Sequence, residues 1–421
     1  MVYERHALPN GLRVLTAPMP QAQSVSCFVM LAAGSRYETR QQSGIAHFAE
    51  HMFFKGTERR PTAKAISTEI DNLGGEFNAF TGKEYTGYYV KAAAEHRDAA
   101  LDVLVDMLRR SLFDPEEIER EKGVIIEEMN MYFDTPRDFI GGVYEQLLYG
   151  DQPLGWDIIG TKETVRAADR DTFMDFFGRW YKPSRMVVGV GGNIGEGLLD
   201  KVGELLGDMP KEKSPKPKAV KPYANGRVRV FEKKSDQAHL VLGVESYPIN
   251  HPDRYALQLL ATVLGTGMSS RLFTEVRERR GLAYYVFGTN HSYTDAGSLY
   301  SQAGVDINRI DTAITTIAKE FRKIADKKVP KAELQKAKNV AKGRFVLGME
   351  SPQGTIMFGL RREVLEGAAT EPAEVLAAIE KVTAEDVQRV AQDLISSERL
   401  RLAVIGPFGD GSQERFEKLL G

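Results

Sequence analysis

The two halves of this 421-residue sequence repeat each other, and this repeat constrains the fold more than any other feature. Glu117-Ile118 and Thr135-Pro136 recur 216 positions later as Glu333-Leu334 and Ser351-Pro352. A repeat of this length is the size of a whole domain, so each copy is expected to fold around its own core. The sequence therefore predicts two homologous domains.

A Pro- and Lys-rich stretch lies between the two copies. Residues 209–224 contain four prolines among several lysines, a composition typical of an extended, exposed linker. We therefore expect an N-terminal domain at residues 1–208, a linker at 209–224 and a C-terminal domain at 225–421.

The spacing of apolar residues predicts an α+β fold, in which each domain has a mostly antiparallel sheet with helices packed on one face. Hairpin-like pairs of strands alternate with longer amphipathic segments in both halves. The expected strands are 12–17, 25–32, 84–92, 185–191, 227–232, 238–245, 284–293 and 297–305, and the expected helices are 41–54, 62–73, 95–110, 115–133, 169–179, 252–264, 309–326, 331–349 and 383–394.

Chemistry is concentrated in the segment His47-Phe48-Ala49-Glu50-His51. Positions i and i+4 of a helix lie about 5–6 Å apart at Cβ, so His47 and His51 can converge on one metal ion. Glu50 can then reach a water bound to that ion. The flanking residues are apolar, so the histidines are expected to be buried. Burial of an unpaired imidazole costs free energy, and this favours metal binding over a solvated helix face.

A third protein ligand is expected in the helix predicted at 115–133, which begins with an N-cap at Asp114. Glu121 and Glu128 are seven residues apart and return to nearly the same face of a helix. Val124, Ile125 and Met131 lie on or near that face, which indicates that both carboxylates point into the protein. Either acid is a candidate ligand from spacing alone.

These residues resemble the zinc site of the pitrilysin or insulinase (M16) family, the inverzincins, whose motif has the order H-x-x-E-H followed by a distant Glu. The resemblance implies one zinc ion per chain held by His47, His51 and Glu128. Glu50 is then the general base, and Glu121 orients a ligand from behind. Further segments share the resemblance: Leu8–Leu12, Gly34–Glu38, Phe54–Thr57 and Gly74–Thr81.

The second half carries a further mark of the family, an arginine and a tyrosine seven residues apart at Arg277 and Tyr284. The resemblance implies that this pair holds the substrate backbone and stabilises the oxyanion. Arg279 and Arg280 stay open as alternatives to Arg277. The second half lacks the residues of the metal site. At the positions equivalent to His47, Glu50, His51, Glu121 and Glu128, it has Ala256, Leu259, Leu260, Ala337 and Arg344.

The resemblance further implies a metalloendopeptidase that binds unfolded peptides as an added strand at Asn78, Ala79, Phe80 and Thr81. A two-domain chain corresponds to half of the clamshell formed by longer members. We therefore expect a homodimer in which each zinc site faces Arg277 and Tyr284 of the other copy, and a heteromeric partner stays open. Two alternatives stay open for the activity: a non-proteolytic core or processing-type subunit, and a zinc-dependent esterase or amidase.

Composition sets limits on other functions. The formal net charge of −2 gives no global basic field for nucleic acid, and the single cysteine, Cys27, excludes an intrachain disulfide. We expect no membrane span and a cytoplasmic location. The glycine-rich stretch 189–195 lacks the pattern of a dinucleotide-binding loop, and we interpret it as a turn that ends a strand.

Overall fold

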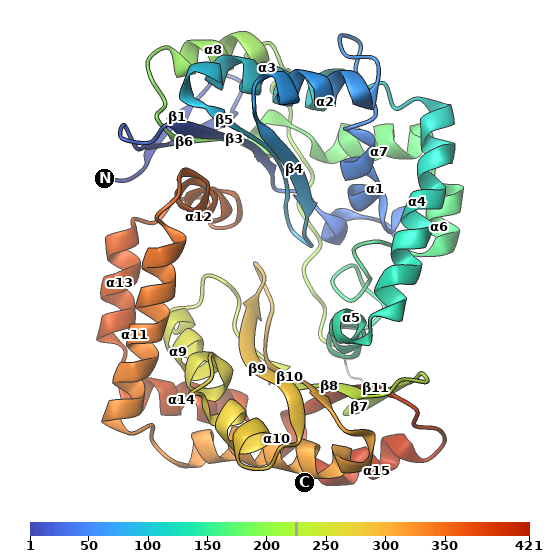
Figure 1. Cartoon of the computed structure of the whole chain (residues 1–421), viewed down its shortest axis with the longest axis vertical. Coiled ribbons are helices and arrows are strands. Elements are labelled where there is room, and N and C mark those ends of the chain that lie inside the picture. The colour runs from blue at the N-terminus through green and yellow to red at the C-terminus, as the bar shows by residue number, and fades with distance from the viewer. Residues whose placement is uncertain (224–225) are drawn as a thin grey trace. The chain divides into compact units, whose positions relative to one another are not determined.

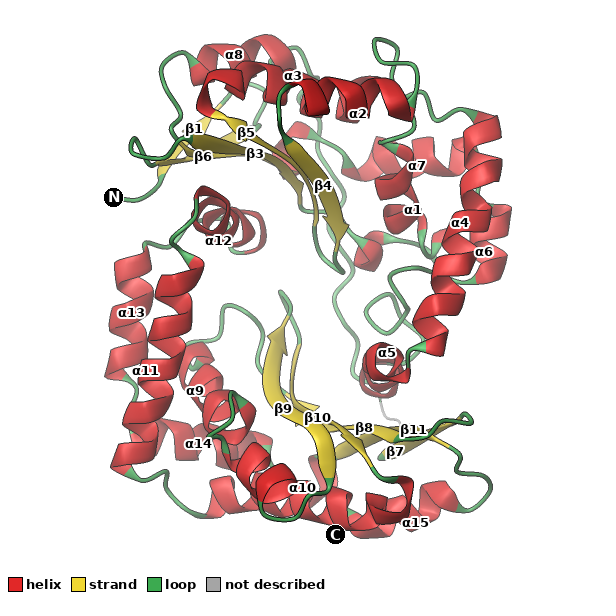
Figure 2. Ribbon diagram, in the orientation of Figure 1, coloured by secondary structure: helices red, strands yellow, loops and turns green. Residues whose placement is uncertain are grey.

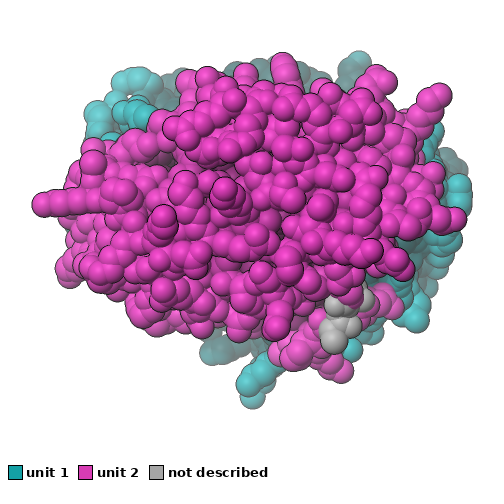
Figure 3. Space-filling view, turned by 90° about the horizontal axis from the view of Figure 1, so that it is seen from below, with its two compact units in different colours: residues 1–130, 156–218, 346–372 teal, residues 131–155, 219–345, 373–421 magenta. Residues whose placement is uncertain are grey.

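The computed structural model describes residues 1–223 and 226–421, which form two compact units (Figures 1 and 3). Ala224 and Asn225, where the predicted linker ends and the predicted C-terminal domain begins, lie outside the described residues. Each unit draws on both halves of the sequence. Unit 1 comprises residues 1–130, 156–218 and 346–372, and unit 2 comprises residues 131–155, 219–345 and 373–421.

Unit 1 is built on a six-stranded sheet with the strand order β1-β2-β6-β3-β5-β4 (Figure 2). β2 and β6 pair in parallel, and every other neighbouring pair is antiparallel. The strands are β1 (Glu4–Ala7), β2 (Arg13–Pro18), β3 (Ser24–Leu31), β4 (Glu76–Thr81), β5 (Thr86–Ala93) and β6 (Met186–Gly192). β1 and β4 are the two edges, and β4 therefore has one side free of strand partners.

Most helices of unit 1 pack on one face of this sheet. Because side chains alternate along a strand, Val25, Cys27 and Val29 of β3 belong to the core shared with these helices. α3 makes the main contacts with β3 and β5, and α1 packs against β4. The helices are α1 (Ile45–Met52), α2 (Ala63–Asn72), α3 (Arg97–Arg110), α6 (Lys162–Ala167), α7 (Arg170–Trp180), α8 (Leu198–Leu206) and the greater part of α4 (Pro115–Asp134).

The opposite face is covered by α12 (Pro352–Leu365), a helix from the second half of the sequence (Figure 1). Phe28 and Met30 of β3 point to this side and pack with Leu360. The approach is close because β6 has glycines here. A Cβ on Gly189 would lie 2.4 Å from Leu360 Cδ1, and one on Gly191 would lie 2.6 Å from the carbonyl oxygen of Pro352.

Unit 2 has a five-stranded sheet with the order β7-β11-β8-β10-β9, in which only β7 and β11 pair in parallel. α5 (Pro136–Tyr149), from the first half of the sequence, packs on β8 and β11. The strands are β7 (Val228–Glu232), β8 (Ala238–Glu245), β9 (Ala283–Ser292), β10 (Gly297–Val305) and β11 (Arg401–Gly406); the other helices are α9 (Arg254–Gly265), α10 (Ile310–Asp326), α13 (Pro372–Lys381), α14 (Ala384–Leu394), α15 (Ser412–Leu419) and most of α11 (Lys331–Gly348).

The predicted fold class is confirmed, since both sheets are mostly antiparallel and carry packed helices. α5 and α12 begin at Pro136 and Pro352, the two prolines that mark the sequence repeat. The two helices that begin at equivalent points of the repeat are therefore each incorporated into the unit otherwise formed mainly by the other half of the sequence. The assignment of domains at 1–208 and 225–421 stays a prediction.

Candidate metal centre

The helix that carries the histidines is short and has a defined start. Gly44, just before α1, has a φ of 94°, and a Cβ there would lie 2.6 Å from the carbonyl oxygen of Ile159. The buried carboxylate of Glu38 accepts hydrogen bonds from the N–H groups of Gly44 and Ala46, each at 2.8 Å. Glu38 thus satisfies two of the unpaired N–H groups at this helix start and fixes the first turn. The helix expected at 41–54 is shorter in the structure: it begins at Ile45, because Gly44 has a left-handed backbone, and it ends at Met52.

His47, His51 and Glu128 converge on one point in unit 1, and their candidate ligand atoms all lie within 4.8 Å of one another. His47 Nε2 is 3.6 Å from Glu128 Oε1, and His51 Nε2 is 3.5 Å from Glu128 Oε2. Ligands about 2.0–2.1 Å from a tetrahedral zinc ion are about 3.4 Å apart. The donor set therefore fits a zinc ion in type, number and spacing.

Glu121 lies behind His51 and contacts its ring. His51 Nδ1 is 2.9 Å from Glu121 Oε1, and Lys55 forms an ion pair with Glu121 Oε2. A proton on Nδ1 that is donated to Glu121 leaves the lone pair on Nε2, the atom that lies 3.5 Å from Glu128 Oε2. Burial raises the pKa of Glu121, but the hydrogen bonds from His51 and Lys55 outweigh burial and hold it below its ordinary value. This carboxylate stays ionised, as the contact requires.

α4 presents Glu121 and Glu128 as its spacing predicts, although part of the supporting argument is wrong. Ile125 is fully buried, but Val124 and Met131 are 50% and 65% exposed. Glu121 nevertheless points into the protein, with its side chain 5% exposed, whereas the Glu128 side chain is 35% exposed. The N-cap prediction is confirmed, because Asp114 Oδ1 accepts a hydrogen bond from the N–H group of Glu116 at 2.8 Å. The proximity of the His47 imidazole, 3.6 Å away, is the main cause that lowers the pKa of Glu128.

Glu50 and the predicted substrate edge lie next to each other. Asn78, Ala79, Phe80 and Thr81 belong to β4, and the hydroxyl of Thr81 donates a hydrogen bond to Glu50 Oε2 at 2.5 Å. The sequence analysis placed Thr81 at the edge but missed this contact, because no local spacing relates a strand residue to a helix residue 31 positions away.

Arg277 and Tyr284 lie in unit 2. Arg277 is in a π-helical segment, Phe273–Glu278, and its guanidinium carbon is 5.9 Å from the centre of the Tyr284 ring. Tyr284 is the second residue of β9 and is 74% exposed. Arg279 and Arg280 instead form ion pairs with Glu275. Of the three arginines, Arg277 is the one described beside the tyrosine.

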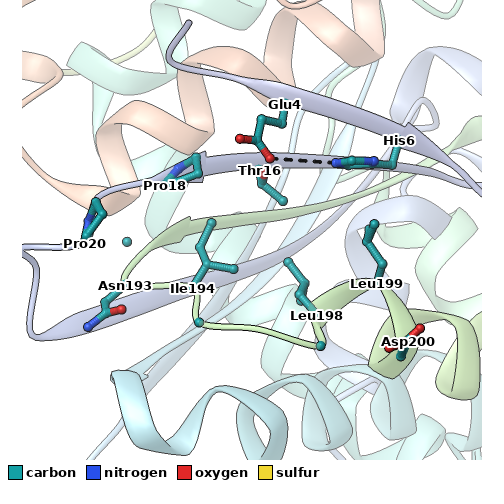
Figure 4. Close-up of a pocket in the computed structure, with 13 residues that line it drawn as sticks. Glu4, His6, Thr16, Pro18, Pro20, Asn193, Ile194, Leu198, Leu199 and Asp200 are labelled. Carbon is teal, nitrogen blue, oxygen red and sulfur yellow. Dashed lines mark ion pairs between the residues drawn. The ribbon is translucent and has the colours of Figure 1, made fainter.

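A separate groove in unit 1 lies between the edge strand β1, its neighbour β2 and the start of α8 (Figure 4). His6 and Glu4 form a 3.9 Å ion pair on its wall, and the segment from Gly192 to Gly197 lines the other side. None of the predicted site residues lines this groove. Gly192 is the last residue of β6, which confirms that the glycine-rich stretch ends a strand.

Comparison with known protein families matches both halves of the chain. Residues 13–162 match the family model described as insulinase (peptidase family M16), and residues 167–341 match the one described as the peptidase M16 inactive domain. A zinc protease of Bacillus subtilis, YmxG, whose name calls it uncharacterized, is 36% identical over 97% of this chain and 99% of its own length. The chain belongs to the M16 peptidase family.

Other M16 relatives agree in length. An uncharacterized zinc protease of Streptomyces coelicolor is 35% identical over 98% of this chain and 91% of its own. Two solved structures share the fold: a protease from Helicobacter pylori, with 23% identity and a TM-score of 0.87, and a peptidase M16 inactive domain from Pseudomonas fluorescens, with 17% identity and a TM-score of 0.89. They cover 96% and 97% of this M16 chain, and each is covered over 99% of its own length. Within the described residues, no helix is both long and apolar enough to cross a membrane.

Proposed function

We propose that the protein is a zinc-dependent endopeptidase that hydrolyses unfolded peptides. The observation that carries this proposal is the convergence of His47, His51 and Glu128, with Glu50 on the same helix. When bound, zinc would lower the pKa of a water molecule towards about 7 and polarise the peptide carbonyl. His47, His51 and Glu128 would hold one ion per chain, and Glu121 would keep His51 in the tautomer that presents Nε2.

The proton transfers fall to Glu50. Its carboxylate accepts a proton from the attacking water and returns it to the leaving amine as the peptide bond breaks. The substrate backbone pairs with the free side of β4 at Asn78–Thr81, because β4 is an edge strand. Pairing through the backbone accepts many side chains but requires an extended segment, so the substrates are peptides and unfolded chains.

The second half matches a family model described as inactive. This match supports the proposal that the first half alone binds the metal ion and that the second half has another role. The repeat places Ala256, Leu259 and Leu260 where the first half has His47, Glu50 and His51. The second half would contribute Arg277 and Tyr284, which stabilise the oxyanion across a two-fold interface between two copies. All three proposed zinc ligands are present and close together in unit 1, which favours an active peptidase over a non-proteolytic subunit.

A peptide digest tests the proposal. The purified protein should cleave a mixed library of unfolded peptides, and a chelator should abolish cleavage until zinc is restored. Glu50→Gln should keep its zinc and its fold but lose a factor of about 10²–10⁴ in kcat, because an amide cannot accept the proton. Cleavage by Glu50→Gln at the wild-type rate would refute the role of Glu50 and the proposed mechanism.

A further inference from the structure

The carboxylate of Glu50 is held by the side chain of Thr81. Thr81 Oγ1 lies 2.5 Å from Glu50 Oε2 and 3.5 Å from the carbonyl oxygen of Ala46. Among residues 1–223 and 226–421, no other side chain is described as a hydrogen-bond donor to Glu50. A threonine hydroxyl has one proton to donate, and the shorter contact to an ionised acceptor is the stronger one. The proton therefore goes to Glu50.

The side chain of Thr81 reaches Glu50 because of its place on β4. Alternate residues of a strand share a face, and Phe77 and Ala79 both pack against the core that includes α1. Thr81 continues this face to the last position of the strand, where it pairs with Thr86 of β5. The hydroxyl is thus carried by a backbone that the β5 ladder already fixes, so it has little freedom to move away from Glu50.

We propose that Thr81 is a positioning residue that sets the orientation of Glu50, an inference that rests on the proposed function. The hydrogen bond occupies Oε2 and restrains rotation of the carboxylate, which leaves Oε1 to accept the proton of the attacking water. Because Thr81 belongs to the edge strand itself, one strand fixes both the general base and the peptide that pairs beside it. A displacement of about 1 Å in a reacting group costs up to ~100-fold in rate, so this restraint matters for kcat.

Two substitutions at Thr81 test the role. Thr81→Val keeps the shape of the side chain and the backbone pairing but removes the proton. It should lower kcat by about 10- to 100-fold, leave KM within about 2-fold and keep one zinc ion per chain. Thr81→Ser restores the hydroxyl and should return kcat to within about 3-fold of the wild type. A wild-type kcat for Thr81→Val, or equal losses in Thr81→Val and Thr81→Ser, would overturn the inference.

Two further variants distinguish a specific effect of Thr81 on Glu50 from a general loss of stability in β4. Thr86→Val removes the buried hydroxyl directly opposite, which donates to the carbonyl oxygen of Ala33 at 2.9 Å and does not touch Glu50. It should lower thermal stability but leave kcat per zinc-loaded chain close to the wild type. In a Glu50→Gln background, Thr81→Val should cause no further loss of kcat, because its effect passes through the base.

The same set distinguishes failure of the inference from failure of the proposed function. An inactive Glu50→Gln with a fully active Thr81→Val would refute only the role of Thr81. A fully active Glu50→Gln would refute the base and the positioning residue together.

Discussion

At the scale of single residues, the assignment of the metal ligands makes a measurable prediction. His47→Ala, His51→Ala and Glu128→Gln should each release most of the zinc, because each removes one of only three protein ligands. The exposed Glu127 is adjacent in sequence and does not belong to the cluster, so Glu127→Gln is the matched control and should keep one zinc ion per chain. Elemental analysis of the purified variants measures this. Full retention of zinc by Glu128→Gln would contradict the ligand assignment.

The sequence predicted the residues that lie close together along one helix and missed contacts that the fold alone creates. The spacing of His47 and His51, and of Glu121 and Glu128, follows from helical geometry. Loops and strand pairing bring three further side chains to this region: Glu38, Lys55 and Thr81. Nothing in the local sequence around them predicts these contacts. Lys55 lies four residues after His51, but α1 ends at Met52, so helical spacing does not predict the ion pair of Lys55 with Glu121.

At the scale of secondary-structure elements, the fit of α12 against β6 depends on two glycines, and their substitution should have unequal effects. An alanine at Gly189 meets the flexible end of Leu360, which can move, whereas an alanine at Gly191 meets the backbone oxygen of Pro352, which cannot. We expect Gly191→Ala to lower the free energy of unfolding by about 1–3 kcal/mol and Gly189→Ala to lower it by less. Urea denaturation measures both.

A second substitution checks the cause of this difference. Leu360→Ala removes the atoms that crowd position 189, so it should offset part of the cost of Gly189→Ala but none of the cost of Gly191→Ala. Equal rescue of both variants would show that α12 adjusts as a rigid body and that the contacts at Gly189 and Gly191 are not independent.

Several helices and strands were not predicted from the sequence, and physical reasons explain why α5, α12 and β1 were missed. α5 contains Gly141 and Gly142, and α12 contains Gly354 and Gly359, and interior glycines cost a helix about 1 kcal/mol each. Tertiary packing overrides this preference: a Cβ on Gly359 would lie 2.5 Å from the ring of Tyr3. β1 is a short, mostly exposed edge strand, so it has no apolar alternation to detect. In contrast, the longer amphipathic helices and the central strands β2, β3, β5, β6, β8 and β10 were predicted to within a few residues. The central strand β11 was missed, although it is almost fully buried.

At the scale of the whole molecule, the proposed pairing of two copies can be tested by complementation. Glu50→Gln and Tyr284→Phe homodimers should each be nearly inactive. In an equal mixture with free exchange of subunits, half of the dimers are mixed, and each mixed dimer regains one intact site, so about a quarter of all sites should recover. The peptidase rate of the mixture measures this recovery.

The control for this experiment uses the double variant. Glu50→Gln mixed with Glu50→Gln/Tyr284→Phe should stay inactive, because every copy then lacks the general base. If labelled subunits exchange but activity does not return in the first mixture, Arg277 and Tyr284 do not act on the zinc site of a second copy.

Because α12 belongs to unit 1 but comes late in the sequence, unit 1 cannot be completed until α12 has been synthesised. The apolar face of β2, β3 and β6 has left the ribosome long before α12, since about 160 residues separate the end of β6 from the start of α12. At ~5–20 residues per second, that face waits roughly 10 to 30 seconds for its cover. The N-terminal sheet therefore completes this packing only after α12 has been made, and until then its uncovered apolar face is a site at which growing chains can aggregate.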